Sequence, residues 1–235
     1  MGATYTFGDS TTNLASAAAQ TKYNNTNLAY PTLCLRIKGD AWTNCSTYQE
    51  KNLFLFASRN NATLRVGQTD PGVYYCSFRN DNYGVQYTNL TFTPSASTFY
   101  LIYLQYAETG DGGTYYAVAN SSGTILDNSG VLFNGGLAGS TGEFELGPKI
   151  VAKGYTLDGC AIYSAVKTGA ARFAVPTSGD SNIVGLYKFD EGSGTSVADA
   201  TGGTSLTIAG SGTWNTNDGA WDGSTSLFRP YFITG

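Results

Sequence analysis

Short apolar segments, separated by turns rich in glycine, asparagine and aspartate, are the feature that most restricts the fold of this chain. Between residues 52 and 92, the segments NLFLFAS, ATLRVGQ, GVYYCSFR and GVQYTNLTF follow one another at close and regular spacing. Each is long enough for a strand and too short for a typical helix. This regular spacing of short apolar segments and turns predicts an antiparallel β-sandwich or barrel.

The rest of the chain continues the pattern. ATYTFGD and TLCLRIKGD alternate, which predicts strands buried on one face, whereas TFYLIYLQYA is apolar on both faces and predicts a central strand. TYYAVAN, SSGTIL, EFELG and CAIYSAV extend the series. Helix is expected only as a short turn around LASAAAQ and as one or two turns in SAVKTGAARFAV, where Gly169 and Pro176 limit its length. No linker or internal repeat divides residues 1–235, so we expect one all-β domain.

Charge and hydropathy exclude several classes of partner. The net charge is −4, and the 13 basic residues are scattered without a cluster, so we expect no nucleic-acid partner. No apolar run approaches the roughly 20 residues that a membrane-spanning helix requires, which predicts no membrane insertion. The first residues, MGATYTFGDS, lack the pattern of a secretory signal. A protein acting outside the cell would then leave by another route or arrive on a particle.

Four widely spaced cysteines, Cys34, Cys45, Cys76 and Cys160, form no C-x-x-C pair, so neither a zinc site nor a redox motif is predicted. We expect them to be small buried apolar residues, with disulfides as the alternative.

The absence of histidine leaves carboxylates as the main candidate catalysts. Glu143 and Glu145 in TGEFELGPK would lie on one face of a strand, about 7 Å apart at their Cα atoms, which is a spacing compatible with glycoside hydrolysis. The alternative is a solvent-facing pair on a structural strand. We expect the latter, and therefore no enzyme.

Acidic residues on glycine-rich loops make Ca²⁺ the one cofactor that the sequence suggests, because this cation prefers several oxygen ligands. Tight turns use the same residue types, through side-chain hydrogen bonds to the backbone, and no fixed ligand spacing is present. The candidate metal ligands are Asp190, Glu191, Asp199, Asp218 and Asp222.

Sugar recognition is the third kind of site considered. Lectin-like sites stack an aromatic ring on a sugar and orient it with amide and carboxylate groups on loops. Each candidate also has a structural explanation, since loops are polar and tyrosine is abundant. The candidate sugar-binding residues are Trp42, Asn44, Asn80, Asn82, Tyr83 and Asp111.

Five segments resemble the motifs of the concanavalin-A-like jelly rolls, and in particular the laminin-G-like modules of bacteriophage virion proteins and bacterial surface proteins. They are LYKFDEGSGTSVADATGG, SGTWNTNDGAWDG, LCLRIKG, FYLIYLQYA and LDGCAIYSAVKTGAA. Arg36 stands where the family usually has tryptophan, so the sheet surface there is expected to differ from that of sugar-binding relatives. The resemblance implies an antiparallel two-sheet jelly-roll sandwich.

The order of these motifs is shifted, because the closing motif LDGCAIYSAV comes before the opening motif that begins at residue 185. The N-terminal YTFGDSTTNL is similar to a strand that normally follows the opening motif. The chain therefore resembles a circularly permuted jelly roll, whose cut would lie in an exposed loop. Alternatively, residues 185–235 complete the sheet of a neighbouring subunit by strand exchange.

The resemblance implies a non-catalytic structural or decoration protein on a bacteriophage virion surface, forming a homo-oligomer with contacts to other virion proteins and to a possible glycan ligand. The alternatives are a carbohydrate-binding module of a cell-surface or fibre protein and, ranked last, a glycoside hydrolase.

Overall fold

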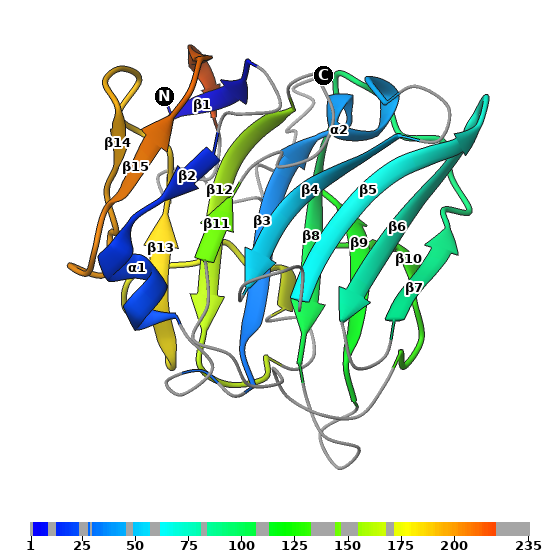
Figure 1. The fold of residues 1–235 in the computed structure, drawn as a ribbon, viewed down its shortest axis with the longest axis horizontal. Helices are drawn as coiled ribbons and strands as arrows, with labels where there is room; N and C mark the ends of the chain where they lie inside the picture. Colours follow the sequence, from blue (N-terminus) through cyan, green and yellow to red (C-terminus); the bar gives the residue numbers. More distant parts are fainter. Residues whose placement is uncertain are drawn as a thin grey trace, which may run out of the picture.

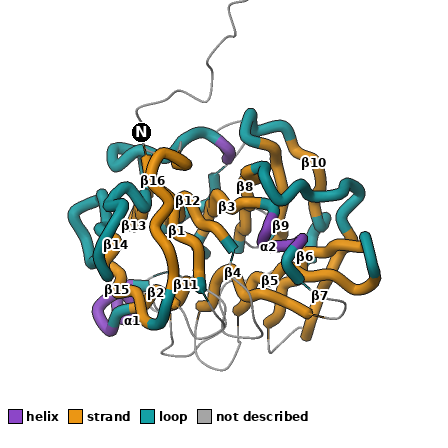
Figure 2. The backbone as a smooth tube through the Cα atoms, turned by 90° about the horizontal axis from the view of Figure 1, so that it is seen from above, coloured by secondary structure: helices purple, strands orange, loops and turns teal. Residues whose placement is uncertain are grey.

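The computed structural model of the chain has two antiparallel β-sheets packed face to face (Figure 1). It describes residues 2–8, 13–23, 28, 30–45, 49–56, 62–80, 84–106, 113–132, 144–146, 155–167 and 172–219. Figure 2 shows the two layers from above, with the strands from β16 to β9 in one and the strands from β15 to β7 in the other. The antiparallel two-sheet sandwich that the sequence predicts is confirmed.

The first sheet, called sheet A here, has the order β10-β9-β8-β3-β12-β1-β16, and β13 also pairs with β12. In that order its strands are β10 (Ile125–Asn128), β9 (Tyr115–Asn120), β8 (Phe99–Gln105), β3 (Thr32–Lys38), β12 (Thr156–Tyr163), β1 (Gly2–Phe7), β16 (Gly212–Gly219) and β13 (Ile183–Tyr187).

The second sheet, sheet B, has the order β14-β15-β2-β11-β4-β5-β6-β7. In that order its strands are β14 (Ser196–Val197), β15 (Leu206–Ala209), β2 (Asn13–Ala15), β11 (Phe144–Leu146), β4 (Gln49–Phe56), β5 (Ala62–Asp70), β6 (Val73–Asn80) and β7 (Gly84–Asn89). The four segments between residues 52 and 92 thus form β4 to β7, as predicted.

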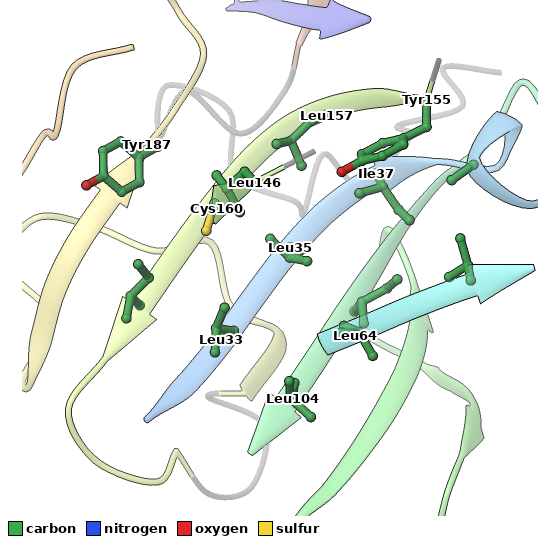
Figure 3. Close-up of a cluster of buried hydrophobic side chains, with 14 of the residues drawn as sticks. Leu33, Leu35, Ile37, Leu64, Leu104, Leu146, Tyr155, Leu157, Cys160 and Tyr187 are labelled. Atoms are coloured by element: carbon green, nitrogen blue, oxygen red, sulfur yellow. The ribbon is translucent and has the colours of Figure 1, made fainter. Parts of the chain in front are cut away.

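One large apolar core fills the space between the sheets, because alternate residues of each strand point inward. Sheet A contributes Leu33, Leu35 and Ile37 of β3, and sheet B contributes Leu64 of β5 and Leu146 of β11 (Figure 3). All five side chains are completely buried. The alternation that was visible in the sequence therefore decides which face of each strand meets the other sheet.

A second, smaller apolar cluster covers the outer face of sheet A. It joins Cys34 of β3 and Tyr103 of β8 to Phe173, which lies in the connection between β12 and β13. The expectation that residues 32–40 form a half-buried strand is therefore wrong: β3 is buried on both faces. The physical reason is long-range, since the covering residues lie more than 130 positions further along the chain.

The C-terminal motifs pair with strands of their own chain. β16 pairs with β1, and β15 pairs with β2. One edge of β12 is shared by two collinear strands, because Tyr5 of β1 lies opposite Leu157 while Tyr187 of β13 lies opposite Cys160. The opening and closing motifs are therefore neighbours in space, which is the sheet arrangement that both a circular permutation and a strand exchange predict.

The described residues contain two short helices, α1 (Ala17–Lys22) and α2 (Asp40–Thr43). The first lies where a helical turn was predicted, and begins after Ser16, whose Oγ accepts a hydrogen bond from the Ala19 N–H at 3.1 Å. The second was not predicted. In the other segment with a helix prediction, the described part has a single 3₁₀ turn at residues 172–173. No helix in the described ranges is long and apolar enough to cross a membrane.

All four cysteines are buried and free, which confirms the expectation that they pack as small apolar residues. Burial raises the pKa of Cys34 to about 12, so its thiol stays protonated at neutral pH.

Candidate functional site

Trp42 does not lie on a sugar-accessible loop. It is the third residue of α2, its side chain is completely buried in the core, and its ring packs edge-on against Tyr100 at a centroid distance of 5.6 Å. The proposal that Trp42 stacks on a sugar is therefore wrong, because neither face of its ring is open to a ligand. Its Nε1 donates a hydrogen bond to the carbonyl oxygen of Tyr75 at 3.3 Å.

The other predicted sugar-binding residues are not gathered into one site by the described structure. Asn44 is exposed directly after α2. Asn80 is the last residue of β6, and only its backbone is described. Asn82, Tyr83 and Asp111 lie outside the described residues, so their role stays a prediction.

Asp199, predicted as a candidate Ca²⁺ ligand, instead organises the turn that follows β14. Its Oδ1 accepts hydrogen bonds from the backbone N–H groups of Leu186 and Thr201, at 3.0 and 2.9 Å, and from the Thr201 hydroxyl at 2.8 Å. Its Oδ2 pairs with Lys22 of α1 at 2.9 Å. Both carboxylate oxygens already have protein donors, so Asp199 acts in this structure as a hydrogen-bond acceptor for the fold.

Among the described side chains, Asp190 and Glu191 do not form a metal-binding group with Asp199. Glu191 is exposed, and its Oε1 accepts a hydrogen bond from the Ala198 N–H at 2.7 Å, while Asp190 is also exposed. Only the backbone of Asp218 is described, and Asp222 lies outside the described residues. Within the described ranges, no group of three or more Cys, Asp or Glu side chains could hold a metal ion.

The candidate catalytic pair is only partly described. Glu143 lies outside the described residues, and Glu145 is known only by its backbone in β11. That strand pairs with β4 and β2 inside sheet B, as both explanations predict, so the role of the pair stays a prediction.

A pair of tyrosines marks the outer face of sheet B beside its β7 edge. Cys76 and Phe78 of β6 point into the core, so Tyr75 and Ser77 point to the outer face. Tyr87 lies opposite Ser77 in the register, and Asn89 lies opposite Tyr75. We call Tyr75, Ser77, Tyr87 and Asn89 the tyrosine ledge.

The ledge combines an open aromatic ring with polar groups. The Tyr87 side chain is 65% exposed, an unusual degree for a large ring, whereas Tyr75 is 6% exposed. The two rings contact edge-on with centroids 6.3 Å apart, which fixes the plane of Tyr87. Asn89 is exposed, and the buried hydroxyl of Ser77 has no hydrogen-bond partner among the described residues.

Two core residues hold the strand that supports the ledge. The Trp42 indole N–H donates to the carbonyl oxygen of Tyr75, and the hydroxyl of Tyr116 donates to the carbonyl oxygen of Cys76 at 2.7 Å. Both bonds reach β6 from the core side, so they fix the backbone without covering the outer face. Sequence reasoning missed this site, although the alternation in GVYYCSFR and GVQYTN assigns Tyr75 and Tyr87 to positions where they could share a face.

Replacing Trp42 with phenylalanine tests its structural role. Trp42→Phe keeps an aromatic ring in the core but leaves the buried Tyr75 carbonyl without its indole donor, so we expect a loss of about 1–3 kcal/mol in unfolding free energy. Chemical denaturation followed by circular dichroism measures this. A variant with wild-type stability would contradict the role assigned to the indole N–H.

The two-layer topology defines the fold: the chain folds as a jelly-roll sandwich of the concanavalin-A-like type. No protein-family model and no curated protein sequence matches it. Several solved structures are similar to it in fold. A proposed carbohydrate-binding protein from Bacteroides ovatus ATCC 8483 is 16% identical and superposes with a TM-score of 0.61, covering 92% of this chain and 60% of that protein. The chain thus spans about three fifths of that structure's length.

A second similar structure is the native heptameric SAP-like pentraxin from Limulus polyphemus. It is 11% identical, covers 88% of this chain and 95% of its own, and has a TM-score of 0.51. The LG1–3 region of the laminin alpha2 chain also matches, at 14% identity over 80% of this chain and 34% of that structure, with a TM-score of 0.43. At these identities, the likeness concerns the fold.

Proposed function

We propose that this chain is a non-catalytic carbohydrate-binding module that holds a glycan against the tyrosine ledge. The observation that carries the proposal is the exposed Tyr87 ring, fixed edge-on against Tyr75 and flanked by the amide of Asn89. Sugar rings present C–H groups on one face, which pack on an aromatic surface, and hydroxyls at their rim, which bond to amide and hydroxyl groups. The fold shared with a proposed carbohydrate-binding protein supports this proposal.

Tyr87→Ala tests the ledge. The variant removes the stacking surface and leaves the core intact, so we expect unchanged stability and a loss of roughly fivefold to tenfold in glycan affinity. A glycan array identifies a ligand for the wild type, and isothermal titration calorimetry then compares the variants.

Tyr30→Ala is the matched control, because Tyr30 is also exposed, at 38%, but lies just before β3 of the other sheet. It should bind as the wild type does. Equal losses in both variants, or no loss in Tyr87→Ala, would contradict a site at the ledge.

The virion role expected from the resemblance stays a prediction, as does a virion-surface location, and the structural neighbours do not support either. Self-association also stays a prediction. The heptameric state of the pentraxin is compatible with it, and light scattering of the purified chain measures it directly.

A further inference from the structure

The connection between β12 and β13 forms a pocket on the outer side of sheet A, so that the two sheets of the sandwich separate it from the tyrosine ledge. The pocket has a volume of about 370 Å³, at the lower end of the range for small-molecule sites. One part of its lining is apolar and the other is polar. The lining residues are Val166, Lys167, Ala174, Val175, Asp180, Ser181 and Asn182.

An ion pair is fixed at the polar side of this pocket. Lys167 Nζ lies 3.5 Å from Asp180 Oδ2 and donates a hydrogen bond to the Tyr163 hydroxyl at 2.9 Å. That hydroxyl donates in turn to Asp180 Oδ2 at 2.9 Å, and the Thr177 hydroxyl donates to Asp180 Oδ1 at 2.6 Å. The ammonium also lies 4.0 Å from the centroid of the Tyr163 ring. Both charged groups are therefore held in place before any ligand arrives, which lowers the entropic cost of binding.

The pair keeps unused hydrogen-bonding capacity. An ammonium has three donors, and the described residues supply acceptors for two of those of Lys167. A carboxylate has about four acceptor positions, and four donors reach Asp180: the hydroxyls of Tyr163 and Thr177, the backbone N–H of Thr177, and the ammonium of Lys167 at 3.5 Å. The Lys167 side chain is 14% exposed and the Asp180 side chain 26% exposed. Among the described residues, one ammonium proton of Lys167 thus has no acceptor, and its long 3.5 Å contact with Asp180 can be exchanged for hydrogen bonds to a ligand at the rim of the pocket.

A vicinal diol fits this arrangement. Its two oxygens lie roughly 3 Å apart, about one hydrogen-bond length, so one hydroxyl can accept from the ammonium while its neighbour donates to the carboxylate. The apolar surface of Val166 and Val175 then faces the C–H groups of the ring that carries the diol. A simple anion fits less well, because the carboxylate of Asp180 would repel it.

We propose that this pocket is a second carbohydrate site, which binds the vicinal diol of one terminal pyranose through Lys167 and Asp180. The site does not involve Tyr87, so this proposal is tested independently of the proposed function. A chain with sites on both faces of the sandwich can bridge two glycans, which raises its overall affinity for a densely glycosylated surface.

The experiment titrates the ¹⁵N-labelled chain with methyl α-mannopyranoside, methyl α-glucopyranoside and methyl β-galactopyranoside, and follows the amide signals of residues 164–167 and 180–182. We expect saturable shifts with at least one of these pyranosides. The corresponding deoxy sugar, which lacks one hydroxyl of the diol, should bind at least about tenfold more weakly.

Two near-isosteric variants identify the groups responsible. Asp180→Asn and Lys167→Met should each weaken the shifts by about tenfold or more, and Tyr87→Ala should leave them unchanged. Asp70→Asn, at the exposed end of β5, is the control for loss of one carboxylate. Thermal unfolding confirms that the variants are folded.

Three results would overturn the proposal: no saturable shift with any of the pyranosides, equal binding of the deoxy sugar, or full binding by both folded variants. Loss of the shifts in Lys167→Met but not in Asp180→Asn, together with competition by acetate, would assign the pocket to carboxylate ligands instead.

Discussion

Asp199→Ala should lower the unfolding free energy of the chain by about 3–5 kcal/mol. The substitution removes the acceptor for the backbone N–H groups of Leu186 and Thr201 and leaves Lys22 without its ion-pair partner. The Asp199 side chain is completely buried, so water does not replace these bonds without local opening. Urea denaturation measures the loss.

Glu191→Ala is the matched control, because it removes a neighbouring carboxylate that makes one hydrogen bond on the exposed surface. Its cost should stay below about 1 kcal/mol. Comparable losses in the two variants would contradict a special role for Asp199. A Ca²⁺-dependent gain in wild-type stability that Asp199→Ala abolishes would instead support the metal site predicted from the sequence.

The same carboxyl group makes stability depend on pH in a defined direction. Burial alone would raise the pKa of Asp199, but the hydrogen bonds from Leu186 and Thr201 and the contact with Lys22 outweigh burial and hold the pKa below its usual value. A lowered pKa means that the stabilisation is present above the pKa of the unfolded chain, near 4, and is lost as pH falls through the folded value. The difference in unfolding free energy between the wild type and Asp199→Ala should therefore become smaller at acidic pH.

Asp158→Ala should also lower the unfolding free energy by about 3–5 kcal/mol, because it leaves the buried guanidinium of Arg36 without its carboxylate. The guanidinium of Arg36 donates to Asp158 Oδ2, and the two side chains are only 7% and 1% exposed. The guanidinium also stacks on the ring of Phe99, 4.1 Å from its centroid, but an aromatic face does not replace a carboxylate.

The double variant Arg36→Met with Asp158→Leu should recover most of that loss, since an apolar pair of similar volume needs no compensation of charge. Lys38→Met, on the same face of β3, is the control and should cost less than about 1 kcal/mol. A double variant as unstable as Asp158→Ala would contradict this expectation, because it would show that the ion pair stabilises the fold by more than the neutralisation of its two buried charges. Urea denaturation of the wild type and the three variants measures these differences in unfolding free energy.

Local patterns in the sequence predicted the strands well, because alternation and turn residues act within a few positions. They failed where the outcome depends on distant segments. Arg36 was expected on a half-exposed strand, but Asp158 and the residues packed over sheet A come from far along the chain. Trp42 sits in the polar stretch KGDAWTNC, which is typical of an exposed turn, yet the four-residue helix α2 directs it inward.

The functional residues show the same difference between features that local patterns predict and features that depend on distant segments. The order of the laminin-G-like motifs predicted a permuted or strand-exchanged jelly roll, and the N-terminal strand β1 does pair with β16, which carries part of the C-terminal motifs. The tyrosine ledge was not predicted, because it depends on the register between β6 and β7, which sets Tyr87 opposite Ser77. Asp199 was a candidate Ca²⁺ ligand with a structural turn as the alternative, because aspartate on a glycine-rich loop serves both metals and turns. Its donors, from α1 and from the N–H groups of Leu186 and Thr201, show the structural role, and those of α1 and Leu186 come from segments that no local pattern links to Asp199.

The pairing of β1 with β16 also determines how the chain responds to mechanical force. Gly2 lies opposite Gly219, and the two strands run antiparallel from that point. A load applied through these two residues would pull directly across the first pair, so the hydrogen bonds would break one after another, as in a zipper, and would not resist together in shear. Held at these positions, the module would therefore peel open at low force, beginning with β16.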